Sequence, residues 1–138
     1  MLLAIDAGNT NIVFAVFHED KLIAMWRMAT VAQRTADEYA TFLLIMMMEA
    51  GIDPAEVNTA IIGSVVPDAN FHLQNLCENH FQCRPMIIGN ADVDLGLDIQ
   101  MDNPAEVGAD RLINAVSGMV RYGAPLILID YGTATTFD

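Results

Sequence analysis

Six consecutive residues near the start of the chain, Asp6-Ala-Gly-Asn-Thr-Asn11, combine the groups that a phosphate-binding turn needs. Gly8 lets a ligand approach the backbone closely because it has no Cβ atom. Consecutive N–H groups in such a turn form a concavity that binds anions. We therefore expect Asp6 to hold Mg²⁺ through water, and Asn9 and Thr10 to donate hydrogen bonds to phosphate oxygens.

A related stretch, Asp130-Tyr-Gly-Thr-Ala-Thr-Thr136, follows the apolar run from Pro125 to Ile129. In both stretches an Asp ends a predicted strand, a Gly stands two residues later, and a Thr lies at or just beyond the next position. An Asp-Gly turn is also ordinary hairpin chemistry, but two copies favour a nucleotide site. Paired loops of this kind resemble the two phosphate loops of the acetate and sugar kinase/Hsp70/actin superfamily, in which ATP lies between two ribonuclease H-like domains.

A third group of residues stands where a helix is predicted to begin, at Glu106-Val-Gly-Ala-Asp-Arg111. The first turn of a helix offers free N–H groups and the positive end of the dipole, so it can receive a substrate carboxylate. Arg111 can add a charge-assisted pair. Asp110 is suited to accept a proton from a substrate hydroxyl that attacks a γ-phosphate, although a dipole-stabilised Asp is the alternative interpretation.

Composition limits the remaining possibilities. The 138 residues suit one domain of ordinary size, and 54% apolar residues are ample for a core. A formal net charge of −12 disfavours direct contact with nucleic acid or anionic lipid. The sequence has no Gly-x-x-x-x-Gly-Lys stretch, so a phosphate site here must rely on metal ions and backbone N–H groups.

Apolar patterns predict the elements that position these residues. Three runs, Leu2 to Ile5, Ile12 to Phe17 and Leu22 to Met28, predict an antiparallel meander. A capping box at Thr35 predicts a helix that continues to Ala50. A short turn of helix at Pro54, a strand from Thr59 to Val66, a helix from Pro67, a strand from Met86 to Ile88 and a helix ending near Tyr122 are expected to follow. This order of elements predicts an α/β fold with a mixed sheet and flanking helices.

The last of these helices has a predicted buried stripe. Its members share one helical face: Leu112, Ile113, Val116, Met119 and Val120.

Two further groups of residues could suggest a zinc or a calcium site, but the sequence supports neither well. His72, Cys77, His80 and Cys83 match no common zinc spacing, and a partly buried structural role is the preferred interpretation. The acidic stretch from Ala91 to Glu106 lacks the EF-hand ligand order and predicts a solvated loop that borders a site. Two cysteines fit a reducing compartment, and no apolar run is long enough to span a bilayer, so we expect a cytoplasmic protein.

Four stretches taken together resemble type III pantothenate kinase. They are Asp6 to Asn11, Ser64-Val-Val-Pro67, Pro104 to Arg111 and Asp130 to Thr136, and they occur in the expected order. The resemblance implies a ribonuclease H-like domain of the actin-like ATPase superfamily. It also implies ATP-dependent phosphorylation of pantothenate to 4'-phosphopantothenate, the first step of coenzyme A biosynthesis.

The resemblance also implies roles for individual residues. Asp110 would be the catalytic proton acceptor, Asp130 would help to bind a monovalent cation, K⁺ or NH₄⁺, and Asp6 would bind Mg²⁺ through water. ATP would contact Asp6, Ala7, Gly8, Asn9, Thr10, Asn11, Ile12, Val13 and Thr133. Pantothenate would contact Gly108, Ala109, Asp110 and Arg111. A homodimer is expected, with neither nucleic acid nor membrane as a partner.

Members of the family continue well beyond the second phosphate loop. Residues 1–122 are therefore expected to form the first ribonuclease H-like domain, and residues 123–138 the opening strand and phosphate loop of a second, truncated domain. The chain would then be a truncation, a split gene product or a fragment.

Two other functions stay open: a non-catalytic regulatory or accessory protein of the same fold, and another small-molecule kinase of the superfamily. Retention of Asp110, Arg111 and both loops favours an enzyme, because a scaffold needs none of them together.

Overall fold

The computed structural model describes residues 1–132 and 134–138, and the chain forms two compact units, Met1–Ile87 and Ile88–Asp138. The predicted domain boundary after residue 122 stays a prediction. Among the helices of the described residues, none combines the length and the hydrophobicity needed to cross a bilayer. The cytoplasmic location likewise stays a prediction.

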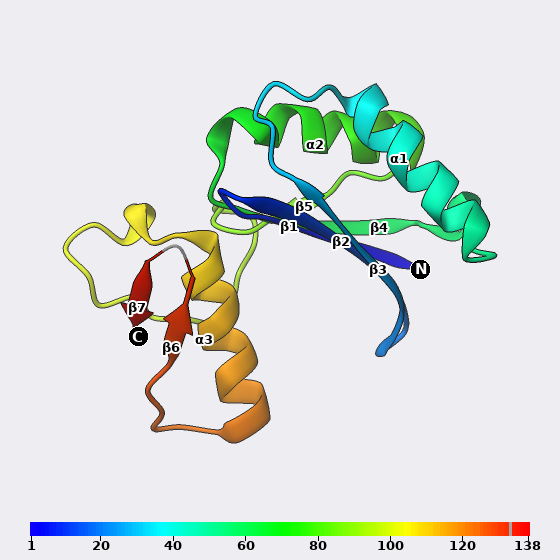
Figure 1. Cartoon of the computed structure of the whole chain (residues 1–138). Coiled ribbons are helices and arrows are strands. Elements are labelled where there is room, and N and C mark those ends of the chain that lie inside the picture. Colours follow the sequence, from blue (N-terminus) through cyan, green and yellow to red (C-terminus); the bar gives the residue numbers. More distant parts are fainter. Residues whose placement is uncertain (133) are drawn as a thin grey trace. The chain divides into compact units, whose positions relative to one another are not determined.

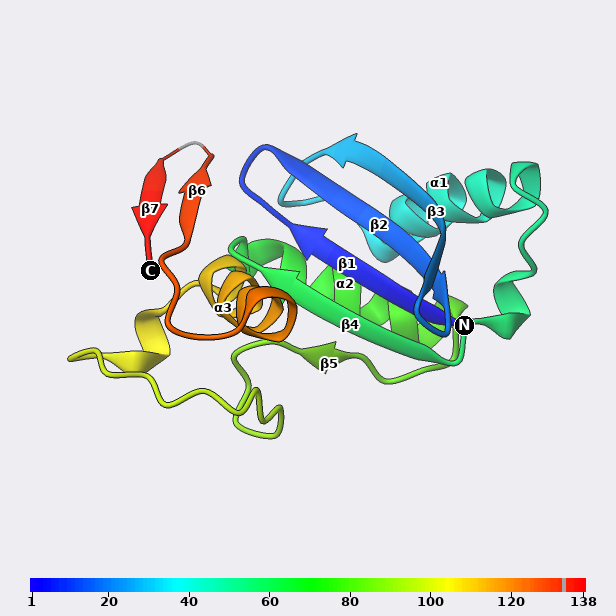
Figure 2. The ribbon, with the colours of Figure 1, turned by 90° about the horizontal axis from the view of Figure 1, so that it is seen from below.

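The first unit is built on a five-stranded mixed sheet. Strands β1 (Leu2–Ala7), β2 (Asn11–His18) and β3 (Lys21–Ala29) form an antiparallel meander. Strand β4 (Thr59–Ser64) pairs in parallel with β1, and β5 (Met86–Ile87) pairs in parallel with β4. Figure 2 shows the resulting order, β3-β2-β1-β4-β5. The predicted α/β class and its three-strand meander are confirmed.

Two helices, α1 (Ala36–Glu49) and α2 (Pro67–His80), cover the same face of this sheet, and a short 3₁₀ turn, Pro54–Glu56, precedes β4 (Figure 1). The predicted capping box begins α1: the Glu38 N–H donates to Thr35 Oγ1 at 3.3 Å, and the Thr35 N–H donates to Glu38 Oε2 at 2.8 Å. The hydrogen bonds from Thr35, the backbone one first, hold the pKa of Glu38 below its usual value. Helix α1 therefore begins where its local sequence predicts.

The core of this unit lies between the sheet and its two helices. Side chains alternate across a strand, so every second residue of β1, β2 and β4 points to the helices. The fully buried large side chains are Leu3, Ile12, Phe14, Val16, Tyr39, Leu43, Met47, Ile62, Leu73, Leu76 and Cys77. Each Leu, Ile, Val, Phe or Met among them contributes about 1.5–3 kcal/mol by leaving water.

The two cysteines considered for zinc are buried, and one of the two histidines contacts a neighbouring helix. Cys77 and Cys83 are free and buried, and burial raises the pKa of the Cys77 thiol to about 12. His80 is half-buried and its Nε2 lies 2.9 Å from Asp37 Oδ1, which links α2 to α1. Within the described part of the chain, no three His, Cys, Asp or Glu side chains gather as a metal site.

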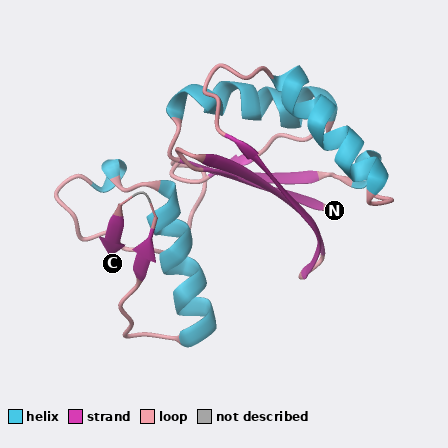
Figure 3. Ribbon diagram, viewed as in Figure 1, coloured by secondary structure: helices cyan, strands magenta, loops and turns pink. Residues whose placement is uncertain are grey.

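The helix and the hairpin of the second unit are drawn in Figure 3. A 3₁₀ turn, Pro104–Glu106, precedes α3 (Ala109–Tyr122), and β6 (Ile129–Tyr131) pairs antiparallel with β7 (Thr135–Phe137). The acidic stretch before α3 is largely irregular. Its Asp92, Asp94 and Asp98 are exposed, whereas the alternating apolar residues are half-buried: Val93, Leu95, Leu97 and Ile99.

The predicted buried stripe of α3 is wrong at Ile113, which is 37% exposed, and in the last turns of the helix. Leu112 is buried, but Met119 is 42% exposed and Val120 is 82% exposed. The helix instead approaches the hairpin through Gly118, where an added Cβ would lie 2.8 Å from Leu128 Cδ2. Helical spacing predicts which residues share a face, but not whether another element covers that face.

Candidate functional site

The first predicted phosphate loop joins β1 to β2. Asp6 is exposed and pairs with Val13 across the hairpin, so it lies within β1 rather than after it. The Gly8 N–H donates to the Asn11 carbonyl at 3.0 Å, and a Cβ added to Gly8 would lie 3.2 Å from that oxygen. The turn is therefore tight at the position where the sequence has glycine.

The predicted ATP residues of this loop differ in exposure. Asp6, Asn9, Thr10 and Asn11 are exposed, so their side chains can meet a ligand. The buried residues are Ala7 and Ile12, while Gly8 and Val13 are half-buried. Ile12 is fully buried, so neither its side chain nor its backbone is open to a nucleotide in this structure.

The end of β4 lies beside this loop. The Val65 N–H donates to the Ala7 carbonyl at 3.0 Å. The Ser64 hydroxyl accepts from the Val66 N–H at 3.1 Å and closes its own turn. Tertiary structure thus joins the Ser64–Pro67 stretch to the first phosphate loop.

Thr30 holds the loop from the other side. It follows β3, and its hydroxyl donates to the Gly8 carbonyl at 2.6 Å. Its N–H donates to the Thr10 carbonyl at 3.0 Å. The loop is therefore anchored by residues that follow β3 and β4 as well as by its own hairpin.

The second unit carries the predicted substrate residues at the start of α3. Gly108 is the N-cap, and its carbonyl accepts from the Arg111 N–H at 3.1 Å. Ala109 is buried, and Asp110 is exposed with its Oδ1 accepting from the Arg111 N–H at 2.8 Å. The prediction that Gly108 to Arg111 occupies the first helical turn is confirmed.

Arg111 is held by an ion pair with Asp138, one residue beyond β7. Arg111 Nε donates to Asp138 Oδ1 at 2.5 Å, and Nη2 contacts the same oxygen. The two side chains are 30% and 19% exposed. The hydrogen bond to Asp138 is the main cause that raises the pKa of Arg111 above its usual value, so the guanidinium stays charged.

The β6–β7 hairpin repeats features of the first hairpin. Asp130 pairs with Thr136 as Asp6 pairs with Val13, and the Gly132 N–H donates to the Ala134 carbonyl at 3.1 Å. Thr133, the other predicted ATP residue, lies outside the described residues. In both hairpins the glycine N–H donates within the turn, but to the residue three positions on in the first hairpin and two positions on in the second.

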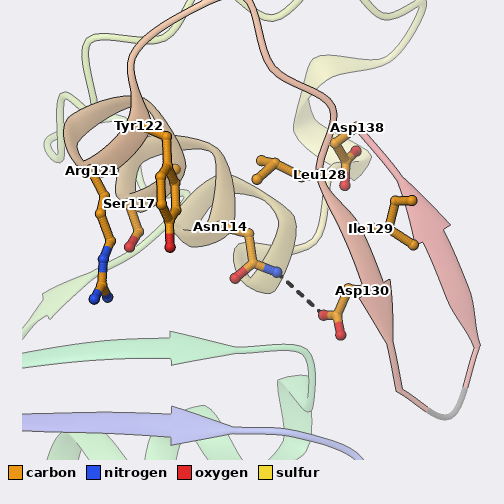
Figure 4. Close-up of a pocket in the computed structure, with 9 residues that line it drawn as sticks. Asn114, Ser117, Arg121, Tyr122, Leu128, Ile129, Asp130 and Asp138 are labelled. Atoms are coloured by element: carbon orange, nitrogen blue, oxygen red, sulfur yellow. Dashed lines mark hydrogen bonds between the residues drawn. The ribbon is translucent and has the colours of Figure 1, made fainter.

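Asp130 faces a hollow of about 360 Å³ within the second unit (Figure 4). Asn114 Nδ2 of α3 donates to Asp130 Oδ2 at 3.3 Å. The hollow is lined by Asn114, Ser117, Gly118, Arg121, Tyr122, Leu128, Ile129, Asp130 and Asp138. Its carboxylate and amide oxygens are donors of the kind that hard cations prefer.

Comparison with known proteins identifies the family. The family model described as type III pantothenate kinase matches residues 2–138. The chain belongs to the type III pantothenate kinase family. The type III pantothenate kinase of Rhodospirillum centenum is 53% identical over 100% of this chain and 53% of its own length. That of Acidiphilium cryptum is 54% identical over 100% of this chain and 52% of its own length. The chain thus spans about half the length of these relatives.

A solved structure supports the fold alone. It is an uncharacterized protein with similarity to the peptidase YEAZ from Pseudomonas aeruginosa, and it superposes with a TM-score of 0.50 at 19% identity. The match covers 89% of this chain and 49% of that protein. An identity this low carries no information about the ligand.

Three residues of the site were missed by the sequence analysis: Thr30, Asn114 and Asp138. Thr30 had a weak signal, because it is the polar residue that follows the third strand of the predicted meander. Asn114 and Asp138 had none, since their partners are 16 and 27 positions away in the sequence.

Proposed function

We propose that this chain supplies nucleotide and pantothenate sites of an ATP-dependent kinase that forms 4'-phosphopantothenate, the first step of coenzyme A biosynthesis. The observation that carries the proposal is the opening turn of α3. In a chain of this family, Gly108 to Arg111 form that turn, and Asp110 is exposed on it.

The substrate side of the proposal uses the residues at this turn. The positive end of the α3 dipole and the Arg111 guanidinium attract the pantothenate carboxylate. Asp110 accepts the proton of the substrate hydroxyl at a carboxylate oxygen as that hydroxyl attacks the γ-phosphate. Its exposure leaves this carboxylate accessible to a substrate.

The nucleotide side uses the two hairpin loops. The exposed Asn9, Thr10 and Asn11 donate to phosphate oxygens in the first loop, with Thr133 as the proposed contact in the second. The half-buried Gly8 and Val13 contribute through the backbone, while the buried Ala7 and Ile12 support the loop from beneath.

Two carboxylates fit the proposed cations. Asp6 is exposed and Asp130 is half-buried, and both offer the oxygen donors that Mg²⁺ and K⁺ or NH₄⁺ require. Asp6 would hold Mg²⁺ through water, and Asp130 would help to hold the monovalent ion. When bound, these cations neutralise phosphate charge.

A homodimer is part of the same proposal. Ile45 and Met48 on α1 are 51% and 68% exposed, which leaves apolar surface that a second subunit could cover. Light scattering that shows a monomer at micromolar concentration would contradict this assembly.

The proposal is tested by following ADP formation from Mg·ATP and pantothenate, with and without K⁺. We expect K⁺-dependent turnover that falls about 10²–10⁴-fold in Asp110→Asn, since general acid–base catalysis contributes that much. Asp102→Asn is the matched control, because it removes the same charge from an exposed site in the same unit.

The chain spans about half the length of its relatives, so ADP formation is also measured with the R. centenum enzyme. Asp110→Asn proteins that melt normally and retain full activity would refute the proposed role of this carboxylate.

A further inference from the structure

We propose that Thr30 is the positioning residue of the first phosphate loop, and that its hydroxyl fixes the direction in which the loop presents its N–H groups to a phosphate. This inference rests on the proposed nucleotide site. All the residues that carry it lie within the first compact unit.

Two hydrogen bonds from the one residue define the contact. The Thr30 hydroxyl donates to the Gly8 carbonyl at 2.6 Å, across 22 positions of sequence. The Thr30 N–H donates to the Thr10 carbonyl at 3.0 Å and continues the pairing of β2 with β3. Only the bond to the Gly8 carbonyl depends on the side chain. A substitution of Thr30 can therefore remove this bond without altering the backbone pairing.

Peptide geometry converts this contact into an orientation. In a planar trans peptide the carbonyl and the following N–H point in opposite directions. Because the Gly8 carbonyl points to Thr30, the Asn9 N–H must point away from Thr30. The Thr30 hydroxyl therefore determines which side of the loop carries this donor.

Other hydrogen bonds fix the backbone that precedes the Gly8–Asn9 peptide, so the Thr30 hydroxyl controls the orientation of this peptide alone. The Ala7 carbonyl is fixed by the Val65 N–H at 3.0 Å, and the Gly8 N–H is fixed by the Asn11 carbonyl at 3.0 Å. This peptide turns about the Gly8 ψ bond, which has few steric limits in a glycine, so without the hydroxyl it can rotate. A rotated peptide would present a carbonyl oxygen, which repels phosphate, in place of the N–H.

Two substitutions separate the hydroxyl from the shape of the side chain. Thr30→Val keeps the β-branched shape and removes the donor, while Thr30→Ser keeps the donor. Thr41→Val is the matched control, because the Thr41 hydroxyl also donates to a carbonyl, that of Asp37 at 2.8 Å, on the exposed surface of α1.

The affinity for Mg·ATP is measured by titration calorimetry, and the exchange rate of the Asn9 amide is measured by NMR. We expect Thr30→Val to weaken Mg·ATP binding about tenfold, which is the upper range for the net contribution of one hydrogen bond. The Asn9 amide should shift and exchange at a changed rate. Thr30→Ser and Thr41→Val should match the unsubstituted chain in both measurements.

Two results would overturn the inference. One is a Thr30→Val chain that binds Mg·ATP as tightly as the unsubstituted chain, which would leave the proposed function standing. The other is an Asn9 amide that is unchanged in Thr30→Val. If the unsubstituted chain fails to bind Mg·ATP, the nucleotide function is contradicted, and the Asn9 amide alone decides whether Thr30 positions the loop.

Discussion

The ion pair between Arg111 and Asp138 fastens the β6–β7 hairpin to α3, and its contribution can be measured. Asp138 also closes the hairpin, since its N–H and carbonyl exchange hydrogen bonds of 3.0 and 2.8 Å with Leu128. The substitution Asp138→Asn keeps the size of the side chain and one acceptor oxygen, but it removes the negative charge. It therefore isolates the charge of the pair.

The expected magnitude follows from the exposure of the two groups. Their side chains are 30% and 19% exposed, so the pair is only partly screened by water. A hydrogen bond to a charged group contributes about 1.5–3 kcal/mol, and a neutral one about 0.5–1.5 kcal/mol. Asp138→Asn should thus lower the free energy of opening the end of the hairpin by about 1 kcal/mol. This change corresponds to about a fivefold larger equilibrium constant for opening.

Amide hydrogen exchange of Leu128 is the appropriate assay, because this N–H is released when the end of the hairpin opens. We expect exchange about fivefold faster in Asp138→Asn, in line with the free energy just given. Asp102→Asn makes the same change in net charge at an exposed position and should leave the Leu128 rate unchanged. Equal rates in the two variants would refute the argument that the pair holds the hairpin.

Two further predictions concern the first unit. Leu73→Ala removes a fully buried side chain from α2 and should lower the free energy of unfolding by about 2–5 kcal/mol. Phe71→Ala, at a 68% exposed position of the same helix, should change this free energy by less than about 0.5 kcal/mol. Urea titration measures both values. Burial raises the pKa of Cys77 from 9.0 to about 12, so this thiol should resist alkylation at pH 8 until urea unfolds the chain. Above pH 9 the folded thiol binds more protons than the unfolded one, so stability should fall as the pH rises from 9.0 towards about 12. Equal alkylation rates in the folded and unfolded chain would contradict both statements about Cys77.

Local sequence predicted most of the secondary structure. Continuous apolar runs separated by polar turn residues predicted the three antiparallel strands, because short runs bounded in this way are typical of buried strands. The Thr35 capping box predicted the start of α1, since its hydrogen bonds join residues only three positions apart. The stretch from Glu106 to Arg111 was predicted to begin a helix, and α3 begins within it, with Gly108 as its N-cap.

Predictions that depended on neighbours far along the chain were less successful. Spacing alone predicted that Met119 and Val120 are buried, but in the structure both are exposed. Asp6 and Asp130 were predicted to end their strands, and each lies one residue before the end, because cross-strand pairs of Ala7 with Ile12 and of Tyr131 with Thr135 extend the strands.

The sequence by itself therefore determined the residue types of the proposed site and the family to which the chain belongs. Only the tertiary structure decided which residues hold them in place. The Thr30 hydroxyl meets the Gly8 carbonyl because β2 and β3 pair in one register, and Asp138 meets Arg111 because the hairpin packs on α3. Such contacts join residues 22 and 27 positions apart, and the local preferences of neither partner encode them.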